Sequence, residues 1–384
     1  MQKKIWLSSP HMGGFEKEYV KEAFDTNWVS TLGPNVTGFE IDLKLYLNAD
    51  SNVAALSSGT AAIHLALIIL GVGPGDEVLC QSMTFSASAN PIAYLGATPI
   101  FIDSESETWN MSPEYLEKAI FDRISQGKKP KAIIPVHLYG MPAKMGEIMR
   151  IAEKYHIGVI EDAAEALGSR YKGQNCGTFG EMACLSFNGN KIITTSGGGA
   201  LVAKQQEHSD KAVFLATQAR DEAPHYEHTH IGYNYRMSNI CAGIGRGQML
   251  VLDKHVDKRR SNFEFYKKSL AHISEISFLE ETKDSFSNCW LSCIMVNPKN
   301  GVSRETIRLA LLEDNIETRP LWKPMHMQPV FKDAPYYGAN VSEQLFENGL
   351  CLPSGSNLSQ EELDRVVNGI VNVFENNGVK KVGL

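Results

Sequence analysis

Short apolar runs alternate with amphipathic stretches between about residues 50 and 205 of this 384-residue chain. The apolar runs predict strands at residues 53–57, 77–80, 99–102, 132–136, 158–161, 183–187 and 200–203. The stretches between them predict helices at residues 61–70, 113–125 and 144–155. Strands that alternate with helices favour an α/β fold, in which helices cover both faces of a mostly parallel sheet. We therefore expect ligands to bind in the loops at the carboxyl ends of the strands.

The pattern changes beyond Arg220. Residues 237–268 form a long, largely unbroken helical pattern that predicts a connector. A strand at 289–296, a helix at 304–313 and a closing helix at 360–376 follow it. We therefore predict a large domain with an N-terminal arm over residues 1–250 and a smaller C-terminal α+β domain over residues 251–384.

Charge and cysteine usage exclude several classes of protein. A net charge of -7 argues against a protein that binds nucleic acid or a membrane surface. The first residues lack the apolar stretch typical of a signal peptide, and no apolar run approaches the roughly 18 residues of a membrane span. The seven cysteines are scattered without a Cys-x-x-Cys motif, so we expect reduced thiols, no metal site and a cytoplasmic location.

Lys191 is the main candidate for covalent chemistry. It ends the motif Ser-Phe-Asn-Gly-Asn-Lys at 186–191, just beyond an apolar strand, and a glycine run follows at 197–199. A lysine that is buried enough to lose its proton can form a Schiff base with a carbonyl. Pyridoxal phosphate (PLP) is the commonest cofactor that uses a lysine in this way. Most lysines are solvated surface charges, so this interpretation needs support from the rest of the chain.

Three further strand ends give that support. Ser-Ser-Gly-Thr-Ala at 57–61 opens an apolar helix, where free amides and the helix dipole favour a phosphate; the alternative is simple capping by Ser58 or Thr60. Asp162 follows the strand at 158–161, and PLP needs a carboxylate beside its ring nitrogen. The spacing of Asp162 and Glu165 is also that of a helix capping box. Phe85 follows the strand at 77–80 and offers a ring for stacking, although such an aromatic is more often part of the core.

Four motifs together resemble the DegT/DnrJ family of fold-type I, PLP-dependent sugar-nucleotide aminotransferases. They are Ser-Gly-Thr-Ala at 58–61, Glu-Asp-Ala-Ala-Glu at 161–165, Ser-Phe-Asn-Gly-Asn-Lys at 186–191 and Gly-Tyr-Asn-Tyr-Arg at 232–236. Four other segments, at 7–12, 217–220, 225–228 and 317–323, are most similar to the 4-aminotransferases for UDP-linked 4-keto sugars of bacillosamine-type pathways.

The resemblance implies roles around the cofactor. Lys191 forms the Schiff base and moves protons, Asp162 pairs with the ring nitrogen, Glu165 lies near the ring hydroxyl, and Phe85 stacks on the ring. The phosphate is held by Thr60, Ala61 and Ser186, with Asn188 beside it and Asn234 reaching it from a neighbouring subunit.

Less direct roles concern the sugar nucleotide, which Arg236, Arg319 and His326 are implied to face. Each has an ordinary alternative: a structural ion pair for Arg236, a surface charge for Arg319 and a satisfied loop histidine for His326.

The reaction implied is transfer of an amino group from L-glutamate to C4 of a UDP-linked 4-keto-6-deoxy-N-acetylhexosamine, by ping-pong kinetics in a homodimer with shared active sites. An alternative acceptor is another nucleotide-linked 4-ketosugar, as in GDP-perosamine synthesis. Sugar dehydratases of the same family resemble this chain but carry histidine in place of Lys191. A non-catalytic regulator would be expected to have lost Lys191, Asp162 or the phosphate loop.

Overall fold

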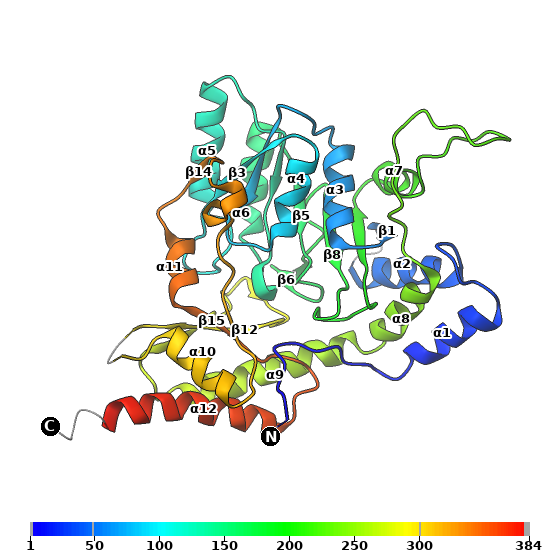
Figure 1. The fold of residues 1–384 in the computed structure, drawn as a ribbon. Helices are drawn as coiled ribbons and strands as arrows, with labels where there is room; N and C mark the ends of the chain where they lie inside the picture. Colours follow the sequence, from blue (N-terminus) through cyan, green and yellow to red (C-terminus); the bar gives the residue numbers. More distant parts are fainter. Residues whose placement is uncertain (1–2, 48–49, 299–300, 380–384) are drawn as a thin grey trace.

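An eight-stranded sheet forms the centre of the computed structural model, which describes residues 3–47, 50–298 and 301–379 (Figure 1). Its strand order is β1-β9-β8-β5-β4-β2-β3-β14. Neighbours from β8 to β14 are parallel, whereas β9 runs antiparallel to both β1 and β8. The prediction of a mostly parallel sheet is therefore confirmed. The strands of this sheet are β1 (Asn52–Leu56), β2 (Glu77–Gln81), β3 (Thr98–Ile102), β4 (Ala132–Ile134), β5 (Gly158–Asp162), β8 (Met182–Ser186), β9 (Gly199–Ala203) and β14 (Tyr336–Tyr337).

Side chains alternate between the two faces of this sheet, and both faces are covered. In β8, Met182 and Cys184 belong to one buried cluster, whereas Ala183 and Leu185 belong to another. The first cluster includes residues of α3 (Gly59–Ile69) and α7 (Gln206–Ala216). On the opposite face, α2 (Pro34–Leu47) contributes to the second cluster. The helices α5 (Pro113–Ser125) and α6 (Met145–Tyr155) contribute to a third cluster on that face. Burial on both faces explains why these strands have continuous apolar sequences.

The helices are α1 (Glu16–Asp25), α2 (Pro34–Leu47), α3 (Gly59–Ile69), α4 (Asn90–Tyr94), α5 (Pro113–Ser125), α6 (Met145–Tyr155), α7 (Gln206–Ala216), α8 (Asn239–Met249), α9 (Leu252–Leu270), α10 (Arg304–Glu313), α11 (Val341–Asn348) and α12 (Gln360–Val379). None of them is long and apolar enough to cross a bilayer, among the residues that the structure describes.

The largely unbroken helical pattern predicted at 237–268 is helical in the structure, with one short interruption between α8 and α9. Val251 leaves the helical conformation, with φ -121° and ψ 4°, and its side chain is buried. Its methyl groups lie 2.7 and 2.8 Å from the position that a Cβ on Gly13 would occupy. Packing against the N-terminal segment therefore interrupts a helical pattern that the local sequence favours.

A second sheet, of order β10-β12-β15-β13, lies in the C-terminal part of the chain. Its core also contains Ile5 from the N-terminal segment. Conversely, β14 joins the large sheet, where it pairs with β3. The large sheet and the core beside the second sheet thus each contain residues from both sides of residue 250, and the division at that residue stays a prediction. The remaining strands are β6 (Arg170–Tyr171), β7 (Gln174–Asn175), β10 (Ile276–Phe278), β11 (Ser285–Phe286), β12 (Ser292–Val296), β13 (Arg319–Pro320) and β15 (Gly349–Leu352).

Candidate active site

A cavity of about 320 Å³ lies at the carboxyl ends of β5 and β8, beside the first turn of α3. Most of the residues predicted for the cofactor line it, although they come from distant parts of the sequence. They are Thr60, Phe85, Asp162, Glu165, Ser186, Asn188 and Lys191. The structure thus brings these side chains together at the strand ends, and their contact with a cofactor stays a prediction.

Lys191 projects into this cavity from the loop that follows β8. Its amine nitrogen lies 3.4 Å from Oε1 of Glu165 and 4.1 Å from the ring centre of Trp290. Only 12% of the side chain is exposed. The amine is thus held between a carboxylate and an aromatic face, and little of the side chain reaches solvent.

Glu165 is fixed by the backbone on its other side. Its Oε2 accepts a hydrogen bond of 2.7 Å from the amide of Tyr139. Burial raises the pKa of Glu165, and the positive charge of Lys191 opposes that rise. This carboxylate is therefore the group beside Lys191 that is best placed to share a proton with it.

Asp162 is the last residue of β5, and its carboxylate is oriented by a serine that the sequence analysis missed. Oδ2 accepts a hydrogen bond of 2.6 Å from Ser88 Oγ, which in turn lies 2.7 Å from Thr84 Oγ1. Oδ1 accepts from the amide of Ala164 at 3.1 Å. The residues directly after Asp162, 163–168, form turns rather than the start of a helix, so the capping-box alternative is wrong. A hydroxyl-rich loop after β2 was the sequence signal for Ser88.

The first turn of α3 supplies backbone amides to the cavity. Ser58 caps the helix, since its Oγ accepts a hydrogen bond of 3.0 Å from the amide of Ala61. Gly59 and Thr60 line the cavity ahead of that amide. Because Ala61 already has this partner, its direct contact with a phosphate stays a prediction. The N-capping alternative and the phosphate interpretation are compatible at this helix end.

Aromatic side chains form the mouth of the cavity. Phe85 is 53% exposed, and its ring centre lies 5.4 Å from that of Trp322. The core alternative for Phe85 is therefore wrong. Trp290 and Trp322 also line the cavity and were missed, because the sequence alone does not bring their distant segments to β5.

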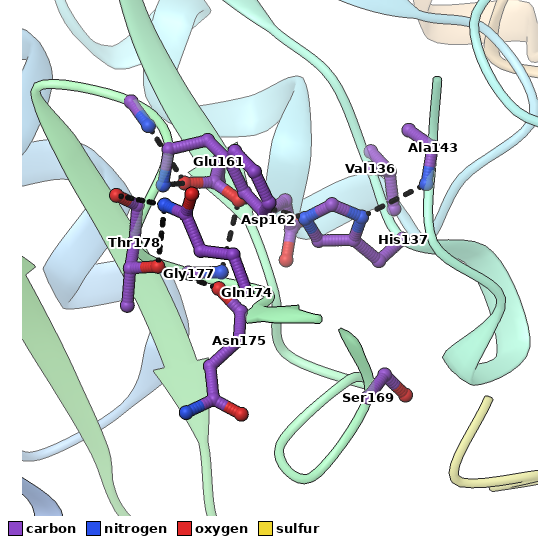
Figure 2. A network of polar contacts seen from close by, with 12 residues as sticks. Val136, His137, Ala143, Glu161, Asp162, Ser169, Gln174, Asn175, Gly177 and Thr178 are labelled. Atoms are coloured by element: carbon purple, nitrogen blue, oxygen red, sulfur yellow. Dashed lines mark hydrogen bonds and ion pairs between the residues drawn. The ribbon is translucent and has the colours of Figure 1, made fainter. Parts of the chain in front are cut away.

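Side chains alternate along a strand, so Glu161, next to Asp162 in β5, lies on the other face of the sheet (Figure 2). Its carboxylate accepts hydrogen bonds of 2.6 to 2.9 Å from the amides of Gly177, Phe179 and Gly180. It also lies 2.9 Å from Nε2 of the buried His137. The amide of Ala143 donates to Nδ1 of that ring, so a neutral imidazole with its proton on Nε2 satisfies both contacts. These bonds fix the end of β5, from which Asp162 projects.

Arg236 and His326 lie outside this cavity in the described chain. Arg236 forms an ion pair with Glu40. His326 lies 2.6 Å from Ser82 Oγ and 3.1 Å from Glu343 Oε1. Their ordinary structural alternatives account for these contacts, and their substrate contacts stay predictions.

Arg319 borders a second cavity, of about 460 Å³, that adjoins the first. The two cavities share Asn190, Trp290 and Trp322. Arg319 forms an ion pair of 2.8 Å with Glu317, and its side chain is 67% exposed. Asn234 lies outside both cavities, and its backbone forms an isolated antiparallel β-bridge with Thr217.

The groups that line the first cavity fit PLP. The amides at the start of α3 suit a phosphate, Asp162 suits a protonated ring nitrogen, and the Lys191 amine suits an aldehyde. The cavity is also within the range of about 300 to 1,000 Å³ that small-molecule sites occupy.

Comparison with known sequences agrees with this chemistry. The chain matches the DegT/DnrJ/EryC1/StrS aminotransferase family over residues 10–371. It is 51% identical over 385 residues to EpsN of Bacillus subtilis (strain 168), which is named as an inferred PLP-dependent aminotransferase; the match covers 99% of this chain and 98% of EpsN. It is 40% identical over 361 residues to GDP-perosamine synthase of Escherichia coli O157:H7, covering 94% and 96% of the two chains.

Solved structures lead to the same assignment. An inferred sugar aminotransferase from Streptococcus pneumoniae, in its PLP form, has a TM-score of 0.89 and 28% identity over 98% of this chain and 100% of that one. An aminotransferase of the same family from Brucella abortus has a TM-score of 0.87 and 30% identity over 93% and 94% of the two chains. The chain therefore belongs to the DegT/DnrJ/EryC1/StrS family and is a PLP-dependent sugar aminotransferase.

Proposed function

We propose that this aminotransferase moves an amino group from L-glutamate to C4 of a UDP-linked 4-keto-6-deoxy-N-acetylhexosamine, giving a 4-amino sugar nucleotide. The convergence of Lys191, Asp162 and Glu165 in a cavity that adjoins a second cavity beside Arg319 carries the proposal. The segments at 7–12, 217–220, 225–228 and 317–323 support the acceptor, because they resemble those of 4-aminotransferases for such sugars.

Lys191 is the acid and base of the proposed reaction. Its Nζ would take the proton from the α-carbon of the amino donor in the first half-reaction and would return a proton to C4 of the sugar in the second. Glu165 accepts a hydrogen bond from the ammonium ion whenever Lys191 carries that proton, since the two groups are 3.4 Å apart. Bound PLP supplies the electron sink that stabilises the carbon left without its proton.

Asp162 keeps a proton on the ring nitrogen of the cofactor in this proposal. A carboxylate next to that nitrogen favours its protonated form. Ser88 donates a hydrogen bond to Oδ2 of Asp162. This bond fixes the side-chain rotamer of Asp162 and therefore also the position of Oδ1. Phe85, at the mouth, would offer its ring for stacking on the bound cofactor.

The strongest competing acceptor is a GDP-linked 4-ketosugar. Relatives that are 40% and 35% identical to this chain are named GDP-perosamine synthases. The sugar dehydratase alternative is disfavoured by Lys191, since such enzymes carry histidine there. The UDP-linked and GDP-linked alternatives differ only in the nucleotide and the sugar of the acceptor.

A visible spectrum of the purified protein tests these assignments in sequence. We expect L-glutamate to bleach the absorption of the lysine-bound cofactor, and the UDP-linked 4-keto sugar to restore it. If only a GDP-linked ketosugar reverses the bleaching, the acceptor is GDP-linked rather than UDP-linked. A spectrum that does not respond to L-glutamate would remove L-glutamate as the donor.

We also propose a homodimer with shared active sites, in which Asn234 reaches the phosphate site of the other subunit. The segment between α7 and α8 extends away from the rest of the molecule (Figure 1), and in it Tyr226 is 78% and Ile231 85% exposed. Exposed apolar side chains on a projecting segment are typical of a subunit interface. The scattered thiols support the cytoplasmic location that we propose for this enzyme.

A further inference from the structure

The loop that carries Lys191 is held from behind by the N-terminal segment and by α9. Figure 1 shows α9 running beneath the large sheet, from α8 toward the C-terminal helices. The backbone carbonyl of Asn190, directly before Lys191, accepts hydrogen bonds from two side chains, and His255 of α9 lies beside the carbonyl of Ile192, directly after it. The lysine itself faces the cavity, so these contacts act on its backbone and leave the amine free.

The carbonyl of Asn190 has two donors. Ser8 Oγ donates to it at 2.7 Å, and Trp290 Nε1 donates at 2.7 Å. A carbonyl oxygen has two lone pairs, so both are used. The peptide that immediately precedes Lys191 is therefore fixed in position and orientation.

One buried guanidinium holds both donors. Arg259 Nη1 donates to the carbonyl of Trp290 at 2.6 Å, and Nη2 donates to Ser8 Oγ at 3.0 Å. Arg259 is 1% exposed and makes no ion pair in the described part of the chain, and its Nε has no partner there. Burial lowers the pKa of Arg259 to about 10, so the group remains charged at neutral pH. A buried charge without a carboxylate destabilises the fold, which points to a role other than stability.

His255 extends this rear contact along the same helix. It lies one turn before Arg259 on α9, so the two side chains share a face. Burial lowers the pKa of His255, and the neighbouring backbone carbonyl of Ile192 opposes that shift. The ring of His11 stacks against that of His255 at 4.7 Å. One face of α9, carrying Arg259 and His255, thus lies behind the residues that flank Lys191.

Trp290 connects this rear support to the amine. Its ring lies 4.1 Å from Lys191 Nζ, and both its carbonyl and its indole N–H are already fixed. We propose that Arg259 is a positioning residue for Lys191, acting through Ser8 and Trp290. The inference rests on the proposed role of Lys191. It makes α9 part of the machinery that sets the direction of the amine.

The Ser8→Ala variant removes one arm of this support, and Ser9→Ala is the matched control. Ser9 is on the same segment but contacts Asn357 rather than Asn190. We expect Ser8→Ala to lower kcat about tenfold with the KM for the amino donor unchanged, because small misplacements of a reacting group cost up to about 10²-fold in rate. Ser9→Ala should leave both constants unchanged.

The second readout needs no substrate. The full chain, freed of cofactor, is treated with a trace of acetic anhydride, and acetylation of Lys191 is compared by mass spectrometry with that of the exposed Lys254. We expect the Lys191 to Lys254 ratio to rise about threefold in Ser8→Ala. Trp290→Phe, which keeps a ring but loses the N–H, should change the ratio in the same direction.

Equal kcat and equal labelling in Ser8→Ala and Ser9→Ala would overturn the inference. So would a fall in melting temperature together with unchanged labelling, because that is the signature of a purely structural role. The labelling ratio does not depend on the donor or the sugar. A wrong acceptor assignment would therefore leave this test intact, and a failed test would leave the acceptor assignment intact.

Discussion

The amine of Lys191 has two neighbours of different kinds, the carboxylate of Glu165 and the indole face of Trp290. Both attract an ammonium ion, so the charged amine has a defined resting place when it is not bonded to the cofactor. The side chain can therefore begin and end each half-reaction at the same position. Its 12% exposure also limits exchange of its proton with water.

Replacing Lys191 by Ala should lower the rate of transamination by about 10³-fold or more, since the acid and base of both half-reactions is lost. The visible absorption of the lysine-bound cofactor should disappear with it. The exposed Lys254→Ala variant serves as the control and should keep both. Retained turnover in the Lys191 variant would disprove its assignment.

Ser88→Ala tests the support of Asp162. The hydroxyl donates to a buried carboxylate, and such hydrogen bonds contribute about 1.5 to 3 kcal/mol. We therefore expect kcat to fall about tenfold or more. Ser86→Ala, two residues away in the same loop, should have little effect. If both variants had the same rate as the original enzyme, Ser88 would have no role in orienting Asp162.

His255 should make the protein less stable as the pH falls. Burial, together with the charges of His11 and Arg259, lowers the pKa of His255 from 6.5 to about 4. Between these values the unfolded chain binds a proton that the folded chain excludes, so stability present above pH 6.5 is lost progressively toward pH 4. At pH 5 the loss is about 2 kcal/mol.

Urea unfolding at pH 7 and pH 5 measures this effect. His255→Gln should flatten the dependence between these two values, whereas replacement of the exposed His272 should not. His11 also has a lowered pKa through burial, so it adds to the same slope. An unchanged slope in His255→Gln would assign the acid sensitivity to other groups.

At the scale of elements, the cavity depends on how closely β9 approaches the start of α3. A Cβ on Gly199 would lie 2.3 Å from the carbonyl carbon of Ser58 and 2.4 Å from the amide nitrogen of Gly59. Both contacts are with backbone, which cannot move without displacing the first turn of α3. The glycine therefore sets the position of the predicted phosphate site.

Gly199→Ala should displace this turn, weaken cofactor retention and lower the free energy of unfolding by about 1 to 3 kcal/mol. Gly73→Ala is a suitable control, because nothing lies within 4 Å of a Cβ there. Cofactor release on dialysis and denaturant unfolding measure the two effects. Equal retention in both variants would mean that α3 tolerates the shift.

Elements whose burial follows a regular pattern were predictable from the sequence. The seven predicted strands agree with β1, β2, β3, β4, β5, β8 and β9 to within two residues at each end, because buried strands are apolar throughout. The strand β14 was missed, since two residues carry no periodicity and its partner β3 lies more than 200 residues earlier. Trp290 was missed because its role arises from a contact that only the folded chain creates. Ser88 was missed because the hydroxyl-rich loop after β2 does not itself show which hydroxyl reaches Asp162.

At the scale of the whole molecule, the catalytic groups and the predicted phosphate contact of Asn234 occupy different regions. Lys191 lines the cavity of its own subunit, whereas Asn234 lies outside it. A monomer would leave Asn234 without the role proposed for it. The dimer is thus a functional hypothesis as well as a structural one.

Mixing two inactive variants tests it. Lys191→Ala and Asn234→Ala subunits that exchange should form mixed dimers in which one site has both native residues. Activity should recover to about a quarter of the original, because half of the dimers are mixed and half of their sites are intact. A mixture that gains no activity over the Asn234→Ala protein alone would show that each site is complete within one subunit.

The pairing of β14 with β3 also has a consequence for synthesis on the ribosome. The outer edge of β3 receives its partner only after residue 337 has been made, although β3 itself ends at residue 102. At 5 to 20 residues per second, that edge waits roughly 10 to 50 s for its partner. An unpaired strand edge is a template for association with other chains. The nascent polypeptide is therefore most exposed to misassembly in this interval, when a chaperone would protect it.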